Sequence, residues 1–139
     1  LLQEENGLTP IHIEDSVSSL SAILLNDAYY QALMDGRENM RGISVLKPEW
    51  IIPFKAKAWL DLREKKDVDS SDIKKHRNDI IRIVSDMVLQ KCILPDEVRK
   101  DMEKFIEQFD VTESELKNLK IRGTKPEDIK RVLQTTYLD

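Results

Sequence analysis

Apolar residues recur at helical spacing through most of the chain after Pro48, and this periodicity constrains the fold more than any other feature of the sequence. Because proline suits the first position of a helix, a helix is predicted from Pro48 to about Lys66. Pro53 falls inside this segment and predicts a bend or a boundary near residue 52. A second helix is predicted after the polar turn at 67–71. Its apolar face carries Ile73, Ile80, Val84 and Met87, together with Arg77.

Shorter helices are predicted in the last third of the chain. One begins near residue 95. Two more begin at 112–115 and 124–127, where a threonine and a glutamate three residues apart have the spacing of a capping box. The first of these two is predicted to end at Gly123. The helix that begins near residue 95 carries an apolar stripe of Val98, Met102, Phe105 and Phe109.

Strands are predicted only near the N-terminus. Residues 8–14 alternate enough for a short strand, and 42–46 fit a second strand or an extended connector. Between them, 17–33 is predicted as one helix or as two divided at Asn26-Asp27, with a stop at Gly36. One or two strands do not form a stable sheet alone, so we expect them to belong to a mixed sheet whose other strands precede residue 1. The predicted fold class is α+β and predominantly helical, a helical bundle packed on one or two strands of that sheet.

Composition narrows the class of protein. Apolar residues make up 40% of the 139 residues and charged residues 35%, which fits a packed core with a charged surface rather than a disordered chain. No apolar run approaches the roughly 18 residues of a membrane span. The single Cys92 and the lack of a secretory signal favour the cytoplasm. The net charge of -4 argues against a nucleic-acid-coating surface, and no DNA-binding motif is present. The chain begins with Leu1 rather than Met, so we expect a fragment or a processed chain.

Lys55 is the first candidate site residue, because it lies within the apolar arc of its predicted helix. Burying a charge without a partner costs several kcal/mol, so the ammonium needs an anion, an acidic side chain or a route to water. A phosphate-bearing ligand would satisfy it. From the residues alone, a lysine whose stem packs on the apolar face while its head reaches water is the more frequent case. The apolar neighbours at helical spacing are Ile51, Ile52, Ala58, Trp59 and Leu62.

Three further charged residues have both a structural and a functional interpretation. Lys57 is predicted to form an exposed ion pair with Asp61, four residues later. Arg63 lies one turn beyond Trp59, where it would assist at the Lys55 site or solvate the helix end. Asp79 would orient Lys55 or a bound nucleotide across a helix–helix contact, although an exposed surface carboxylate is the more common situation.

Other chemistry is less well supported. Glu14, on the candidate strand, would point into a cleft as a base or metal carboxylate. His12, His76 and Cys92 lack metal-ligand spacing, so no metal site is predicted. The four glycines are isolated, which excludes a phosphate-binding glycine-rich loop. Asp67-Val-Asp69 resembles a magnesium-binding pair, but it falls in a polar turn and is interpreted as a loop and helix cap.

From Leu46 to Asp79 the chain resembles the bacterial abortive-infection (AbiEii-type) nucleotidyltransferase proteins. The later half of that family often has a leucine, a Pro-Glu pair, two aliphatic residues, a lysine and an alanine in this order, followed by a polar stretch and a helix with lysine and aspartate. The segment Ile11–Glu14 is similar to a strand that contributes a glutamate there, so the similarity covers roughly residues 8 to 90. The corresponding residues here are Leu46, Pro48, Glu49, Ile51, Ile52, Lys55 and Ala58, then Lys74, Lys75 and Asp79.

The resemblance implies a division into residues 1–46, the end of a nucleotidyltransferase-like core, and 47–139, a helical C-terminal region. It implies catalytic roles for Lys55, Asp79 and Glu14, with Lys57 and Arg63 joining Lys55 in binding the nucleotide. The intact parent would use magnesium and a nucleoside triphosphate, with an RNA or protein hydroxyl as acceptor. The family's defining Gly-Ser turn and Asp-x-Asp strand hold the magnesium, and this sequence contains no Gly-Ser dipeptide. We therefore expect that element to precede residue 1, and expect this chain alone to be inactive and to hold no cofactor tightly.

The alternative class is a non-enzymatic helical module that binds an antitoxin partner or a second copy of itself. The apolar stripe of Val98, Met102, Phe105 and Phe109 would then face outward, although packing into a core is the commoner fate of such a stripe. The coding region upstream of Leu1 discriminates between the two classes. A Gly-Ser turn with Asp-x-Asp favours the enzyme, and its absence favours a binding or degenerate protein.

Overall fold

The computed structural model describes residues 22–65 and 70–139, and these form a mainly helical fold with one small antiparallel hairpin. The prediction of a predominantly helical α+β chain is confirmed at this level. The candidate strand at 8–14, with Glu14, lies outside the described residues. The elements are α2 (Asp27–Gly36), β1 (Arg37–Met40), β2 (Ile43–Leu46), α3 (Pro48–Arg63), α4 (Ser70–Asp86), α5 (Asp96–Gln108), α6 (Glu113–Asn118) and α7 (Pro126–Tyr137).

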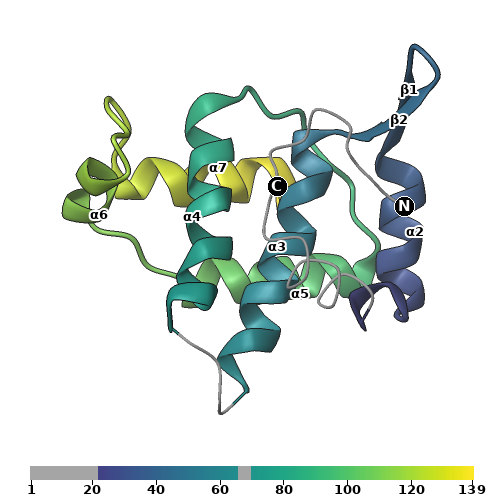
Figure 1. Ribbon diagram of the computed structural model, residues 1–139, viewed down its shortest axis with the longest axis horizontal. Coiled ribbons are helices and arrows are strands. Elements are labelled where there is room, and N and C mark those ends of the chain that lie inside the picture. Colours follow the sequence, from purple (N-terminus) through teal and green to yellow (C-terminus); the bar gives the residue numbers. More distant parts are fainter. Residues whose placement is uncertain (1–21, 66–69) are drawn as a thin grey trace.

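Helices α3 and α4 lie side by side and form the centre of the molecule, while α5 and α7 cross them (Figure 1). Helix α2 packs against α3 and α5 at one end, and α6 lies at the other end beyond α4. The hairpin projects past α2 (Figure 1). Side chains that α3 and α4 direct toward each other therefore lie near the centre of the molecule.

A single cluster of buried apolar side chains joins these helices. The stripe predicted on α5 is fully buried, so it packs into the core and does not face outward as the interaction-module hypothesis required. Tyr29 and Ala32 on α2 belong to the same cluster. Burial of this apolar surface is the main term that stabilises the fold. The other large contributors include Ile52, Ile80, Ile81, Ile129 and Leu133.

Helix α2 begins and ends as local chemistry dictates. The Asn26 side chain accepts hydrogen bonds from the backbone N–H groups of Ala28 and Tyr29, which caps the helix and confirms the division predicted at Asn26-Asp27. Gly36 is the last helical residue and is buried against Trp50. A Cβ at position 36 would lie 2.5 Å from Trp50 Cγ, so the close approach of α2 and α3 requires glycine there.

The hairpin is partly unexpected. Segment 42–46 was predicted as a strand or a connector, and β2 occupies 43–46 of it. Its partner β1 was not predicted, since Arg37–Met40 has little strand propensity. The two strands pair antiparallel with Arg37 opposite Leu46, and the turn places both Arg41 (φ 54) and Gly42 (φ 81) at positive φ. Two-residue hairpin turns need this conformation at both positions.

Helix α3 continues through Pro53, so of the two alternatives predicted near residue 52, a bend or a boundary, the boundary is wrong. Proline has no N–H, and the carbonyl of Glu49 one turn earlier loses its usual donor. The Tyr137 hydroxyl of α7 donates to that carbonyl instead, across 88 residues of sequence. The proline is tolerated because a side chain distant in sequence donates to the carbonyl that lacks its helical partner.

The last two helices differ in detail from the sequence prediction. The capping box of Thr112 and Glu115 is confirmed, but α6 ends at Asn118 rather than Gly123. The box predicted at 124–127 is wrong by one residue. Pro126 takes the first helical position, which makes Lys125 the N-cap, and the Asp128 carboxylate accepts from the Lys125 backbone N–H.

Candidate functional site

Lys55 and Asp79 meet at the contact between α3 and α4. Lys55 Nζ lies 2.9 Å from Asp79 Oδ2, and the lysine side chain is 12% exposed while the aspartate is 30% exposed. An acidic side chain, rather than open solvent, therefore balances the charge of Lys55 in this structure. The pair remains open to solvent on the aspartate side. A charged ligand that reaches Asp79 therefore also comes within reach of the ammonium.

His76 adds a third polar group to this contact, and we call Lys55, Asp79 and His76 the α3–α4 polar cluster. His76 precedes Asp79 by one helical turn and is 8% exposed. Burial, followed by the positive charge of Lys55, lowers the pKa of His76 below its ordinary value, while Asp79 opposes this change. The imidazole is therefore neutral near pH 7. Its Nδ1 atom is buried and has no hydrogen-bond partner among the described residues.

Sequence reasoning considered His76 only as a metal ligand and missed this position. The available signal was its spacing from Asp79, since residues three apart on a helix face the same neighbour. Lys55 was selected because it is a charge within an apolar arc, and Asp79 because it would orient Lys55 across a helix–helix contact.

Lys57 points away from the α3–α4 polar cluster toward α5. Its Nζ lies 3.2 Å from Asp61 Oδ1, as predicted, and 3.9 Å from Asp101 Oδ2, which was not predicted. Burial lowers the pKa of Lys57, but the carboxylates of Asp101 and Asp61 outweigh it and raise the pKa above its usual value. Tyr29 donates its hydroxyl hydrogen to the same Asp101 at 2.7 Å. Lys57 is thus committed to the junction of α2, α3 and α5.

Arg63 occupies a third location, at the C-terminal end of α3. Its guanidinium stacks on the Trp59 ring, with Cζ 4.3 Å from the ring centroid, and donates to Gln108 Oε1 at 2.8 Å. The three cations that the resemblance assigned to the nucleotide therefore lie in three different surroundings. Among the predicted site residues that the structure describes, only Lys55 and Asp79 are in direct contact.

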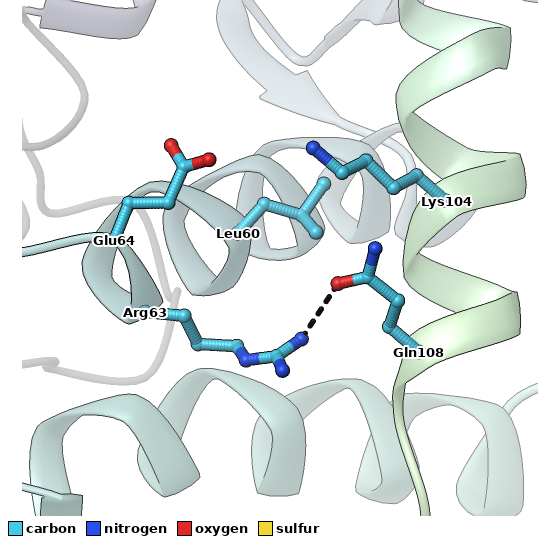
Figure 2. A pocket seen from close by; sticks show the side chains of 5 residues that line it. All are labelled: Leu60, Arg63, Glu64, Lys104 and Gln108. Carbon is cyan, nitrogen blue, oxygen red and sulfur yellow. Dashed lines mark hydrogen bonds between the residues drawn. The ribbon is translucent and has the colours of Figure 1, made fainter.

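Arg63 also lines a shallow pocket between α3 and α5, with a volume of about 230 Å³. In Figure 2, Glu64 and Lys104 lie on one side of Leu60, and the hydrogen-bonded Arg63 and Gln108 lie on the other side. The carboxylate of Glu64 offsets one of the two positive charges. The lining is polar apart from Leu60, and each polar side chain in it is exposed, so the pocket is open to water.

Neither a metal-ligand cluster nor a reactive thiol is found among the residues that the structure describes. Within 22–65 and 70–139, no three side chains of His, Cys, Asp or Glu gather closely enough to hold a metal ion. Cys92 is buried, and burial together with the nearby Glu49 raises its pKa to about 12. A thiol with such a pKa is protonated near pH 7 and a poor nucleophile.

The helices that the structure describes include none with the length and apolar character needed to cross a membrane. Comparison of the chain with protein-family models, with curated proteins and with solved structures finds no match in any of the three. The functional interpretation therefore rests on the α3–α4 polar cluster, in which a partly buried lysine–aspartate pair and a neutral histidine share one helix–helix contact.

Proposed function

We propose that this chain is the helical part of a nucleotidyltransferase-like protein and that Lys55 binds the phosphate groups of a nucleoside triphosphate. The observation that carries the proposal is the Lys55–Asp79 pair, in which a mostly buried lysine side chain contacts a carboxylate that remains partly open to solvent. An ammonium that is already desolvated interacts strongly with a phosphate, because little water screens it. Asp79 acts by holding Lys55 in one orientation.

The chemistry of the proposal is nucleotidyl transfer. The hydroxyl oxygen of an RNA or protein acceptor attacks the α-phosphorus, the bond from this phosphorus to the pyrophosphate oxygen breaks, and the hydroxyl proton passes to solvent water. Negative charge on the leaving phosphates grows as this bond breaks, and Lys55 is placed to stabilise that charge. The mixed sheet of such a protein, with its Gly-Ser turn and Asp-x-Asp strand, is assigned in this proposal to residues that precede Leu1.

Magnesium is the cofactor that the resemblance implies, but the described residues do not fit it, since they offer no cluster of metal-ligating side chains. We assign no step at the α3–α4 polar cluster to the metal. The role proposed for this chain is limited to phosphate binding by Lys55 and its orientation by Asp79.

The test is a calorimetric titration of magnesium with each of the four ribonucleoside triphosphates into this chain and into Lys55→Ala. Binding that is lost in Lys55→Ala supports the proposal. The matched control is Lys57→Ala, which removes a lysine two residues away that faces α5 and is expected to bind like the unmodified chain. Absence of binding to the unmodified chain, or full binding by Lys55→Ala, contradicts it.

A second candidate function is a helical module that associates with a copy of itself or with an antitoxin partner. The observation in its favour is the connector between α4 and α5, where Val88 is 90% exposed and Ile93 83% exposed. Exposed apolar residues that lie close in sequence are a common mark of association surfaces. Light scattering across a concentration series tests self-association. A dimer that the double variant Val88→Ser with Ile93→Ser dissociates supports it, and a monomer at all concentrations contradicts it.

A further inference from the structure

The Lys55 ammonium has three N–H donors, and the structure fixes one of them. That donor points to Asp79 Oδ2 at 2.9 Å. In the proposed function a second donor binds a phosphate oxygen of the ligand. The third donor needs an acceptor on the protein side, because a desolvated ammonium hydrogen without a partner weakens the whole site.

His76 offers such an acceptor on the same helix face. A neutral imidazole carries one protonated nitrogen and one that accepts, and Nδ1 of His76 is buried without a hydrogen-bond partner among the described residues. His76 lies three residues before Asp79 on α4, and Asp79 Oδ2 contacts Lys55 Nζ at 2.9 Å, so His76 and Lys55 belong to the same helix–helix contact. A buried acceptor without a donor and a buried ammonium with donors to spare are thus neighbours at one helix–helix contact.

We propose that His76 is a positioning residue for Lys55, whose ammonium donates to His76 Nδ1 when a phosphate group is bound. Lys55 is then held by Asp79, His76 and the ligand, one acceptor for each N–H. The ligand class is the polyphosphate of the proposed function, to which the site supplies one positive charge in a fixed direction. This inference rests on the proposed function, because it assigns His76 a role toward the ligand that Lys55 binds.

The charged surroundings are consistent with a neutral His76. From its own helix, Asp79 favours the protonated form of the imidazole, as does Asp72 one turn earlier, while Lys75 disfavours it. From α3, Lys55 disfavours it, and burial has the largest effect in the same direction. An imidazole that stays neutral keeps Nδ1 available as an acceptor.

The experiment compares three variants of His76 by calorimetric titration with magnesium tripolyphosphate, a probe that carries the phosphates without a base. In His76→Asn the amide oxygen can occupy the Nδ1 position, in His76→Gln the amide reaches the Nε2 position, and His76→Leu offers no acceptor. We expect His76→Leu and His76→Gln to raise Kd about tenfold, the value of one hydrogen bond to a charged group. His76→Asn should stay within about threefold of the unmodified chain.

A purely structural His76 would not separate asparagine from glutamine in this way. Circular dichroism and urea unfolding of each variant show that the measured binding belongs to folded protein. Unchanged binding in His76→Leu, or equal binding in the asparagine and glutamine variants, overturns the inference. Binding that survives in Lys55→Ala overturns the proposed function instead, so the two failures are distinguishable.

A spectroscopic measurement tests the same step without relying on affinity. In a chain labelled with ¹⁵N-histidine, the His76 signals are those that disappear in His76→Leu, which leaves His12 as the other histidine. We expect an unprotonated Nδ1 whose resonance moves toward lower frequency when tripolyphosphate is added, as it does when the nitrogen accepts a hydrogen bond. A protonated Nδ1 in the free protein, or no movement on saturation, overturns the inference.

Discussion

A lysine side chain that is 12% exposed keeps little contact with water, and at the residue scale Asp79 is the group that compensates for the lost hydration. The two members of the pair are not equivalent. Asp79 is 30% exposed and keeps access to water when its partner is removed. Lys55 is less than half as exposed, so the energetic consequences of removing each partner should differ.

The first prediction follows from this asymmetry. Asp79→Asn removes the charge that balances Lys55 and should lower the free energy of unfolding by about 1–3 kcal/mol. Lys55→Met keeps the apolar stem and leaves a carboxylate that water can reach, so it should cost about 1 kcal/mol or less. Urea unfolding followed by circular dichroism measures both values. Equal losses would show that the pair is energetically symmetric and that the burial of Lys55 has been overvalued.

A second prediction concerns the protonation of His76. Its pKa in the folded protein lies below the ordinary 6.5, so the unfolded chain binds more protons as the pH falls below that value. The associated stability is fully present above pH 6.5 and is lost as the pH falls through the folded pKa. Unfolding free energies measured between about pH 7.5 and about pH 5 should therefore fall more steeply for the unmodified chain than for His76→Leu. Parallel curves would mean that His76 titrates alike in both states.

At the scale of elements, α3 depends on a contact from the far end of the chain. Pro53 leaves the Glu49 carbonyl without its helical donor, and Tyr137 of α7 supplies the replacement. Glu49 and Tyr137 are both buried, so a Glu49 carbonyl that loses this donor cannot form a hydrogen bond with water instead. The middle of α3 and the end of α7 should therefore be coupled energetically.

The third prediction is a double-mutant cycle on this coupling. Tyr137→Phe keeps the ring and removes the hydroxyl, which should cost about 1–3 kcal/mol because the buried carbonyl is left unsatisfied. Pro53→Ala supplies a backbone N–H at the position from which the helix normally donates to Glu49. In that background, Tyr137→Phe should cost less than half as much, as measured by urea unfolding. Additive losses would argue that the Tyr137 hydroxyl acts elsewhere.

The same contact explains which elements the sequence could predict. The stripe on α5 and the cap at Thr112 are set by residues within one or two turns, and both predictions are confirmed. The continuity of α3 depends on Tyr137, which no local pattern near Pro53 includes. Strand β1 forms because the turn at Arg41 and Gly42 folds it onto β2 rather than because of its own composition. Helix α7 begins one residue later than predicted because Pro126 takes the first helical position.

The residues of the candidate site likewise differ in whether local sequence could predict their role. An apolar arc around a lysine is visible within one helix, and it predicted that Lys55 needs a partner. The pairing with Asp79 was one of two interpretations, because the sequence does not fix how α3 and α4 face each other. His76 was missed, since its importance comes from a missing hydrogen-bond partner, a property of the packed structure alone.

At the scale of the whole molecule, Arg77 connects the centre of the bundle to its outer end. This buried guanidinium on α4 donates to the Asp110 carbonyl at 2.8 Å and to Glu115 Oε2 on α6 at 2.5 Å. Glu115 also forms the capping box with Thr112, and the hydrogen bond from Arg77 lowers the pKa of its carboxyl group. One side chain therefore ties the chain between α5 and α6, and the start of α6, to the core.

The fourth prediction is that loss of this tie releases the α6 end before the rest of the molecule. Arg77→Met keeps an apolar side chain of similar reach but removes every donor to the Asp110 carbonyl and the Glu115 carboxylate, and should lower the free energy of unfolding by about 2–4 kcal/mol. Native-state hydrogen exchange should speed up most for amides at 116–121, whereas those in the middle of α3 should follow the global loss of stability. Glu115→Gln is the matched control, because glutamine preserves the capping box and removes only the charge, so it should cost about 1 kcal/mol. If exchange accelerates equally in α3 and at 116–121, the bundle and its outer end form one cooperative unit, and Arg77 stabilises that unit as a whole rather than the α6 end in particular.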